Sequence, residues 1–223
     1  MAAPLVTTLG VVLAGGRGER LGRGPKALVS LGGSTLLERS LATLAPLCER
    51  IVVTAPADLP LASPALEAGS IEGREVTRVD DPALAAGPLA GLVAGLTASP
   101  FRLALALGAD FPLVRTSFLA ALLERLEPQG KRGPRPSAVV PAPNGILQPL
   151  VAAYPSAAAS RLAAQLERGE RAATRAVAAL GPCLLSDPEL ERLPGGLENV
   201  FNLNTPADLA VAEERLGARR ASA

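Results

Sequence analysis

The stretch that most constrains this chain is residues 11–26, VVLAGGRGERLGRGPK. Its apolar start indicates a buried strand that ends at Leu13. Three small residues follow the strand directly, namely Ala14, Gly15 and Gly16. Because glycine permits positive φ and a close approach of the backbone, we expect N–H groups in this loop to face whatever binds above the strand end. The stretch therefore predicts a ligand site at the end of a buried strand.

Cations follow the glycines at short intervals. The loop carries Arg17, Arg20, Arg23 and Lys26. Positive side chains behind a loop rich in N–H groups suit a polyphosphate. Lys26 also stands out by its rarity, since the chain has 22 lysines and arginines together and only one other lysine, Lys131. A solvated basic loop is the simpler alternative for this stretch taken alone.

Two common phosphate-binding glycine motifs fit the stretch poorly. A P-loop needs G-x-x-x-x-G-K-[ST], whereas Lys26 follows Pro25 and precedes Ala27. Residues 22–27 satisfy the dinucleotide pattern G-x-G-x-x-A, but they begin nine residues after Leu13. A dinucleotide fingerprint lies in the first tight turn after its strand, so this interpretation is weak.

The composition of the chain excludes several classes of function. With 223 residues, of which 48% are hydrophobic, the chain is long enough for a single domain spanning residues 1–223. A net charge of +1 and an aromatic content of 2% argue against nucleic-acid binding and against attachment to a membrane surface. The chain has no histidine, which removes Ser-His-Asp catalysis, imidazole acid–base chemistry and histidine-ligated zinc.

The two cysteines and the N-terminal segment bear on location. Cys48 and Cys183 match no metal-binding spacing, and we expect both to be reduced thiols of a cytoplasmic protein. The first ten residues lack the basic start and the long apolar core of a signal peptide. No apolar run approaches the roughly 18 residues that a membrane-spanning helix needs, so no membrane span is expected.

Strand-like and helix-like segments alternate along the chain, which predicts an α/β fold with a largely parallel sheet. Strands are expected at residues 10–13, 50–54, 75–79, 102–107, 137–140, 147–154 and 183–186, and helices at about 35–44, 89–98, 117–126, 156–168, 172–180 and 206–216. Pro143, Asn144 and Gly145 have hairpin chemistry, so one of the two strands that flank them should run antiparallel. Residues 128–136 are predicted to be an exposed loop, and residues 217–223 a disordered tail.

Acidic and amide side chains follow several of these strands. Asp110 comes soon after the strand at 102–107, and Asp80, Asp81 and Asn204 also end short apolar runs. Because parallel strands present their ligand crevice at their carboxyl ends, Asp110 and the glycine loop are expected to meet there. A carboxylate that faces a polyphosphate needs a divalent cation between them, and Mg²⁺ is the usual one. Turn formation is the simpler role for the aspartates, and helix capping for Asn204.

Five motifs occur in order over almost the whole chain. They are L-A-G-G-x-G-x-R-x-G-x(3)-K at residues 13–26, G-P-L-A-G-L at 87–92, x-D-x-P-L at 109–113, Q-P-L-x-A-x-Y at 148–154 and N-x-N-T-P-x-D-L at 202–209. Together they resemble the molybdenum cofactor guanylyltransferases, a branch of the nucleotidyltransferase superfamily. The resemblance implies a three-layer α/β/α Rossmann-like nucleotidyltransferase fold with a mixed, mostly parallel sheet.

The resemblance also implies roles for individual residues. GTP would contact the glycine loop and the second motif, where the matching residues are Leu13, Ala14, Gly15, Gly16, Gly87, Pro88 and Leu89. Lys26 matches the lysine that binds phosphate, Asp110 the aspartate that binds magnesium, and Asn204 an asparagine near the metal. Asp81, or Asp80 if one gap is placed differently, matches an acid that contacts the nucleotide.

By the same resemblance the acceptor would bind near Gln148 and Asn202. The chain departs from the family in two places. Thr54 stands where an asparagine is common, which leaves a nucleotide contact there in doubt. Ile146 and Leu147 stand where an arginine or another polar residue is common, which makes the acceptor site less certain.

The implied activity is the Mg²⁺-dependent transfer of GMP from GTP to molybdopterin, with proteins of molybdoenzyme maturation as further partners. The acceptor is itself a phosphate and a competent nucleophile, so the absence of histidine costs this chemistry nothing. The demand is in-line placement and neutralisation of charge as pyrophosphate leaves. Lys26, Arg17, Arg20, the loop N–H groups and Mg²⁺ on Asp110 would supply it.

Other activities stay open. One is transfer of CMP to molybdopterin, and another is transfer of a nucleotide to a sugar phosphate or to phospholactate. A non-catalytic nucleotide-binding protein is a third, although Lys26 and Asp110 count against it. Guanine is expected over cytosine, because residues 13–16 and 87–91 differ from the cytidylyl branch and the small Ala90 and Gly91 leave room for a purine.

Overall fold

A mixed sheet forms the centre of the molecule in the computed structural model, which describes residues 6–21, 24–81, 87–127 and 135–221. Eight strands of the described chain build it in the order β10-β8-β9-β7-β1-β4-β6-β5. Their bounds are β1 (Val6–Leu13), β4 (Arg50–Pro56), β5 (Ser70–Ile71), β6 (Arg74–Asp81), β7 (Phe101–Gly108), β8 (Val139–Pro141), β9 (Val151–Pro155) and β10 (Cys183–Leu185). The expected α/β fold is confirmed.

Most neighbouring strands run parallel. β1 lies between β4 and β7 and is parallel to both, and β6 is parallel to β4. The hairpin prediction is also confirmed, because β9 runs antiparallel to both β7 and β8. β9 begins at Val151, four residues later than expected, since the backbone N–H of Gln148 donates to the Pro141 carbonyl and turns the chain first. The carboxyl ends of β1, β4, β6 and β7 consequently share one edge of the sheet.

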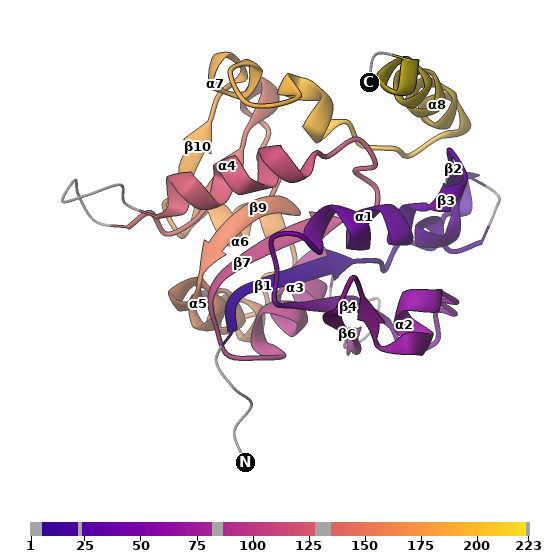
Figure 1. Cartoon of the computed structure of the whole chain (residues 1–223). Coiled ribbons are helices and arrows are strands. Elements are labelled where there is room, and N and C mark those ends of the chain that lie inside the picture. The colour runs from indigo at the N-terminus through magenta and orange to yellow at the C-terminus, as the bar shows by residue number, and fades with distance from the viewer. Residues whose placement is uncertain (1–5, 22–23, 82–86, 128–134, 222–223) are drawn as a thin grey trace.

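Helices cover both faces of the sheet and make three layers (Figure 1). α1 and α4 pack on one face with the core around Leu41 and Phe118, while α3, α5 and α6 pack on the other around Leu92 and Leu162. The helices are α1 (Leu36–Leu44), α2 (Pro64–Ala68), α3 (Gly87–Thr97), α4 (Thr116–Leu126), α5 (Ser156–Glu167), α6 (Ala173–Ala178), α7 (Asp187–Glu191) and α8 (Pro206–Ala221). Thr35 and Glu38 cap α1 reciprocally, which fixes where the helix begins.

Shorter elements connect these layers. They are a hairpin of β2 (Ser30–Leu31) and β3 (Ser34–Thr35) and the 3₁₀ turns η1 (Glu19–Leu21), η2 (Lys26–Leu28), η4 (Pro143–Gly145) and η5 (Gly196–Val200). A third apolar cluster joins the glycine loop to the C-terminal helix, because Leu21 packs with Leu203, Leu209 and Leu216. The loop that carries the cations is therefore anchored from the far end of the chain.

The prediction of a disordered tail at residues 217–223 is wrong as far as Ala221, where α8 ends. Arg219 holds the helix down by donating to the Leu113 carbonyl at 3.1 Å and by pairing with Glu198 at 2.7 Å. Local sequence patterns do not reveal these contacts, because they join residues that lie far apart in the chain. Residues 222–223, and residues 128–134 of the predicted exposed loop, lie outside the described part of the chain.

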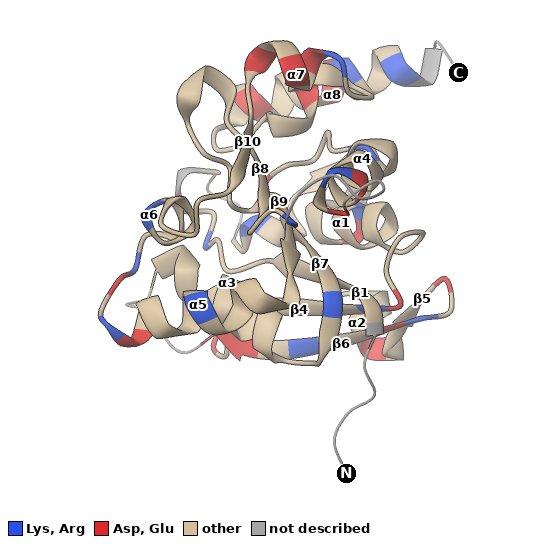
Figure 2. Cartoon of the chain, turned by 90° about the vertical axis from the view of Figure 1, so that its left-hand side faces the viewer, with Lys and Arg blue, Asp and Glu red and all other residues tan. Residues whose placement is uncertain are grey.

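Charged residues gather on helices and connections, while the strands near the centre of the sheet are almost free of them (Figure 2). Within the described ranges, no helix is long and apolar enough to cross a membrane. Both cysteines are free thiols, as expected, with Cys48 buried and Cys183 exposed. Burial raises the pKa of the Cys48 thiol to about 12, so this cysteine is an inert part of the core.

Candidate active site

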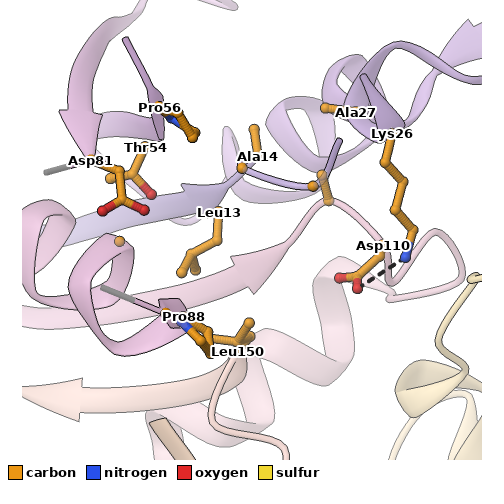
Figure 3. Close-up of a pocket in the computed structure, with 15 residues that line it drawn as sticks. Leu13, Ala14, Lys26, Ala27, Thr54, Pro56, Asp81, Pro88, Asp110 and Leu150 are labelled. Atoms are coloured by element: carbon orange, nitrogen blue, oxygen red, sulfur yellow. Dashed lines mark hydrogen bonds and ion pairs between the residues drawn. The ribbon is translucent and has the colours of Figure 1, made fainter. Parts of the chain in front are cut away.

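A pocket of about 300 Å³ opens at the carboxyl ends of β1, β4, β6 and β7. The glycine loop forms one wall and the start of α3 another (Figure 3). Its lining residues are Leu13, Ala14, Gly15, Gly16, Lys26, Ala27, Thr54, Pro56, Asp81, Gly87, Pro88, Gly91, Ala109, Asp110 and Leu150. Asp81 lies at one end of the pocket and the Lys26–Asp110 pair at the other, with Leu13 and Ala14 between them (Figure 3). The pocket thus has an acidic end and a mixed-charge end.

Backbone hydrogen bonds hold the glycine loop against the sheet edge. The N–H of Ala14 donates to the Thr54 carbonyl at 2.8 Å, which extends the strand pairing by one residue. The chain then folds back, so that the N–H of Lys26 donates to the Gly16 carbonyl at 2.9 Å. Gly18 makes this return possible, because its φ is +69° and an added Cβ would collide with the Gly24 carbonyl oxygen. The loop therefore starts at the carboxyl end of β1 and brings Lys26 back to the same place.

Three predicted residues meet at one point. The ammonium of Lys26 donates to Asn204 Oδ1 at 2.8 Å and lies 3.3 Å from Asp110 Oδ2. The N–H of Leu203 also donates to the Asp110 carbonyl at 2.8 Å, which fixes the segment before Asn204 beside the end of β7. The Lys26 and Asp110 side chains are only 13% and 25% exposed, so their attraction is less screened than that of a surface pair. Two oxygen acceptors thereby converge on one ammonium group.

The two aspartates that end β6 have different environments. Asp81 lines the pocket, and its Oδ1 is buried with no hydrogen-bond partner among the described residues. Burial raises the pKa of the Asp81 carboxyl above its usual range. Asp80 points away, as successive strand residues do, and pairs with Arg78 at 3.4 Å on the exposed side. The sequence left open which of the two aspartates contacts the nucleotide. Their environments favour Asp81, because it is the one that lines the pocket.

Sequence comparisons agree with this geometry. Residues 10–182 match the family model of the MobA-like NTP transferase domain. The chain belongs to this family. A relative described as a probable molybdenum cofactor guanylyltransferase, from Chloroflexus aggregans, is 35% identical over 93% of this chain and 94% of the relative. A molybdenum cofactor guanylyltransferase from Pseudomonas syringae is 31% identical over 96% of this chain and 97% of its own length.

Solved structures of MobA-like and related transferases share the fold. Molybdopterin-guanine dinucleotide biosynthesis protein A from Archaeoglobus fulgidus superposes with a TM-score of 0.70 at 27% identity, covering 94% of this chain and 99% of that chain. The 2-C-methyl-D-erythritol 4-phosphate cytidylyltransferase of Thermus thermophilus superposes with a TM-score of 0.61 at 22% identity, covering 96% and 98%. The second likeness bears on the fold alone. Both support the Rossmann-like architecture of the fold.

Some residues predicted from the family pattern lie away from the pocket. The Leu89 side chain is fully buried in the core beneath α3 and does not line the pocket, so the expected contact of this residue with GTP stays a prediction. Arg17 pairs with Asp58 at 2.6 Å, beside the pocket and not inside it. Gln148 lines a separate hollow, and Asn202 lines neither cavity, although its Oδ1 is buried and lacks a partner among the described residues. The position of the Arg20 side chain lies outside what the structure describes.

The pocket also contains residues that the motifs did not single out. Thr54, where the family pattern is broken, is 1% exposed and lines the pocket beside Asp81. Pro56 and Leu150 add apolar surface to the wall of the pocket. The strand end predicted at residue 54 pointed to this edge, but no pattern in the sequence separated the residues of the pocket wall from their buried neighbours.

The donor atoms at the mixed-charge end fit a magnesium ion in part. The described chain contains no group of three acidic, cysteine or histidine side chains that could hold a metal by itself. Asp110 and Asn204 offer one carboxylate and one amide oxygen, which already converge on the Lys26 ammonium. Mg²⁺ is commonly bound through one or two carboxylates, with substrate phosphates and water completing its shell. The residues present therefore suit a metal that arrives with a nucleotide.

Proposed function

We propose that this protein transfers GMP from GTP to molybdopterin, releases pyrophosphate and forms molybdopterin guanine dinucleotide in the cytoplasm. The observation that carries the proposal is the convergence of Lys26, Asp110 and Asn204 at one end of a pocket whose other end holds Asp81. The names of the relatives support guanine as the base and the molybdenum cofactor as the acceptor.

The two ends of the pocket suit the two ends of a nucleotide. Guanine presents adjacent N–H donors, and the unpartnered carboxylate oxygen of Asp81 would accept from them. Gly87 and Pro88 would border the base, while the N–H groups of Gly15 and Gly16 would face the phosphates. A second hollow of about 340 Å³, lined by Arg17, Lys26 and Asn204 among others, adjoins the phosphate end and would receive the leaving pyrophosphate. Arg20 lies in the same loop.

The chemistry needs placement and charge neutralisation more than proton transfer. The acceptor phosphate attacks the α-phosphorus of GTP, and the bond to pyrophosphate breaks on the opposite side. Lys26 would hold the phosphates and offset the charge that develops on them. Asp110 and Asn204 would hold Mg²⁺, which supplies Lewis-acid stabilisation of the same charge when bound. Gln148 and Asn202 would lie on the acceptor side, and proteins of molybdoenzyme maturation would take the product.

A nucleotide panel tests the proposal. With molybdopterin as acceptor, we expect kcat/KM for GTP to exceed that for CTP about tenfold or more, because cytosine has one donor and would leave a buried acceptor such as Asp81 unpaired. Pyrophosphate release is the measurement. Turnover with CTP equal to that with GTP would assign the protein to cytidylyl transfer. Turnover only with a sugar phosphate or phospholactate, or with no acceptor at all, would refute the proposal.

Two glycines of α3 offer a matched pair of variants. An alanine at Gly91 would place its Cβ 3.0 Å from Asp81 Oδ2, so Gly91→Ala should weaken GTP binding about tenfold while the helix gains some stability. An alanine at Gly95 would collide with Val11 in the core, so Gly95→Ala should lower the free energy of unfolding by about 1–3 kcal/mol. Calorimetric titration with GTP and thermal unfolding separate the two effects. A loss of stability without a loss of affinity in Gly91→Ala would contradict the assignment of the base site.

Asp81 predicts a pH dependence of nucleotide binding. The ionised carboxylate is the acceptor for guanine, and burial raises the pKa of this group, so affinity should fall with decreasing pH before an ordinary carboxyl with pKa near 3.9 is protonated. GTP titrates as well, and Asp81→Asn provides the control for it. The wild-type protein should lose affinity more steeply than Asp81→Asn as the pH is lowered from 7 to 5. Parallel profiles would mean that Asp81 does not contact the base.

A further inference from the structure

A further hollow, of about 760 Å³, lies at the end of the molecule where α7, η5 and α8 meet. Acidic residues of α7 and both acidic and basic residues of α8 gather at this end (Figure 2). The lining residues that matter are Ile146, Gln148, Glu191, Glu198, Phe201 and Arg215. Nothing in the nucleotide site described above uses this hollow.

Phe201 gives the hollow a flat, partly open ring. The chain has four phenylalanines, one tyrosine and no tryptophan, and each of the other four rings is at most 5% exposed in the core. Phe201 alone is only partly buried and lines a cavity. The Arg215 guanidinium lies 4.9 Å from the centroid of its ring. The guanidinium therefore covers one face of the ring, and the two groups form a layered pair on whose outer face a planar heterocycle can stack.

Glu191 gives the hollow a free acceptor. The other acid in the lining, Glu198, is engaged by Arg219 at 2.7 Å and by Arg115 at 3.6 Å. For Glu191 no hydrogen bond or ion pair occurs with any described residue, and its carboxylate lies directly over Gly196, where an added Cβ would collide with it. A carboxylate beside a stacking surface recognises a heterocycle that carries adjacent N–H donors. Guanine and the aminopyrimidinone ring of a pterin both have that edge.

The position of the hollow favours the pterin. Phe201 is three residues before Asn204, which contacts Lys26, and three residues span at most about 10 Å. Gln148 of the hollow is likewise two residues before Leu150 of the nucleotide pocket. A pterin held here would extend its phosphate toward Lys26, whereas a guanine held here would be remote from Asp81. We propose that this hollow binds the pterin ring of the acceptor, stacked on Phe201 and Arg215 with its donor edge on Glu191 and with Ile146 as an apolar cover.

This assignment rests on the proposed function, but it can be tested without catalysis. The protein has no tryptophan and one tyrosine, so the fluorescence of pterin-6-carboxylate is observed without interference, and stacking should quench it. Phe201→Leu keeps apolar volume and removes the flat ring, and Glu191→Gln keeps shape and removes the charge. Each should raise the dissociation constant of the probe about tenfold. Glu213→Gln, an exposed charge on α8 outside the hollow, should leave the dissociation constant unchanged.

Steady-state kinetics give the second measurement. In both variants the KM for molybdopterin should rise about tenfold. The KM for GTP should stay within about twofold of the wild-type value, and the melting temperature within a few degrees of it. Unchanged probe affinity in Phe201→Leu and Glu191→Gln would overturn the assignment, and so would displacement of the probe by guanosine at equal affinity. If wild-type protein bound the pterin in this hollow but made no dinucleotide from GTP, the proposed function would fail and the pterin site would stand.

Discussion

Replacement of Asp110 by asparagine is expected to lower kcat about a thousandfold while leaving the fold intact. The change keeps the size of the side chain, and the Asp110 backbone would still accept its hydrogen bond from Leu203. It removes the carboxylate that pairs directly with Lys26, at the point where Lys26 meets Asn204. A lost metal ligand removes several kcal/mol of charge stabilisation in the transition state, which corresponds to a factor of this order. Pyrophosphate release at saturating GTP and Mg²⁺ measures it.

Asp80→Asn is the matched control for this experiment. Asp80 is an aspartate at the end of β6 in the same sheet, but it faces outward and pairs with Arg78. Its loss should change kcat less than twofold, in line with the small effect of most exposed ion pairs. Near-normal turnover of Asp110→Asn at saturating Mg²⁺, with an unchanged melting temperature, would show that Asp110 does not hold the metal.

Asp110 and Lys26 were predictable from the sequence because strand ends and glycine loops are local features. A buried parallel strand followed by an acid implies a crevice at the sheet edge, whatever the rest of the chain does. The Asn204 contact is 178 residues from Lys26 along the chain, and the family pattern, not periodicity, pointed to it. The same pattern also matched Leu89 to a residue that contacts GTP, and the structure buries the side chain of Leu89 in the core beneath α3.

The choice between Asp80 and Asp81 needed the register of β6. Neighbouring residues of a strand face opposite sides, so a shift of one residue exchanges their roles. The register is fixed by pairing with β4, where Pro56 lies opposite Asp81. The composition of the last residues likewise did not predict that α8 continues to Ala221, because that extension depends on the contacts of Arg219 with Glu198 and Leu113. Tertiary contacts of this kind lie beyond the reach of local sequence patterns.

Lys26 lies beside the proposed metal ligands and would also hold the phosphates of GTP. The variant Lys26→Met tests both roles. Its ammonium lies where Asp110 Oδ2 and Asn204 Oδ1 converge, at 3.3 and 2.8 Å. A metal that uses the same two oxygens must displace it, and the phosphates of GTP offer the displaced ammonium a new partner. Lys26→Met keeps the aliphatic stem that packs against Gly16 and removes the charge. We therefore expect kcat/KM for GTP to fall about a hundredfold or more, with guanosine binding unchanged.

The same variant should bind a divalent cation more tightly in the absence of nucleotide. Mn²⁺, observed by electron paramagnetic resonance, serves as the probe because it accepts the same oxygen ligands as Mg²⁺. Removing a cation that lies beside a half-buried carboxylate removes both competition and repulsion, so the dissociation constant of Mn²⁺ should fall several-fold. Arg17→Met removes a cation of the same loop that is paired with Asp58 instead, and it should leave Mn²⁺ binding unchanged. Equal Mn²⁺ affinity in Lys26→Met and wild type would contradict the idea that the Lys26 ammonium moves from the metal ligands to the phosphates of GTP. A changed base preference at an unchanged rate would contradict it as well.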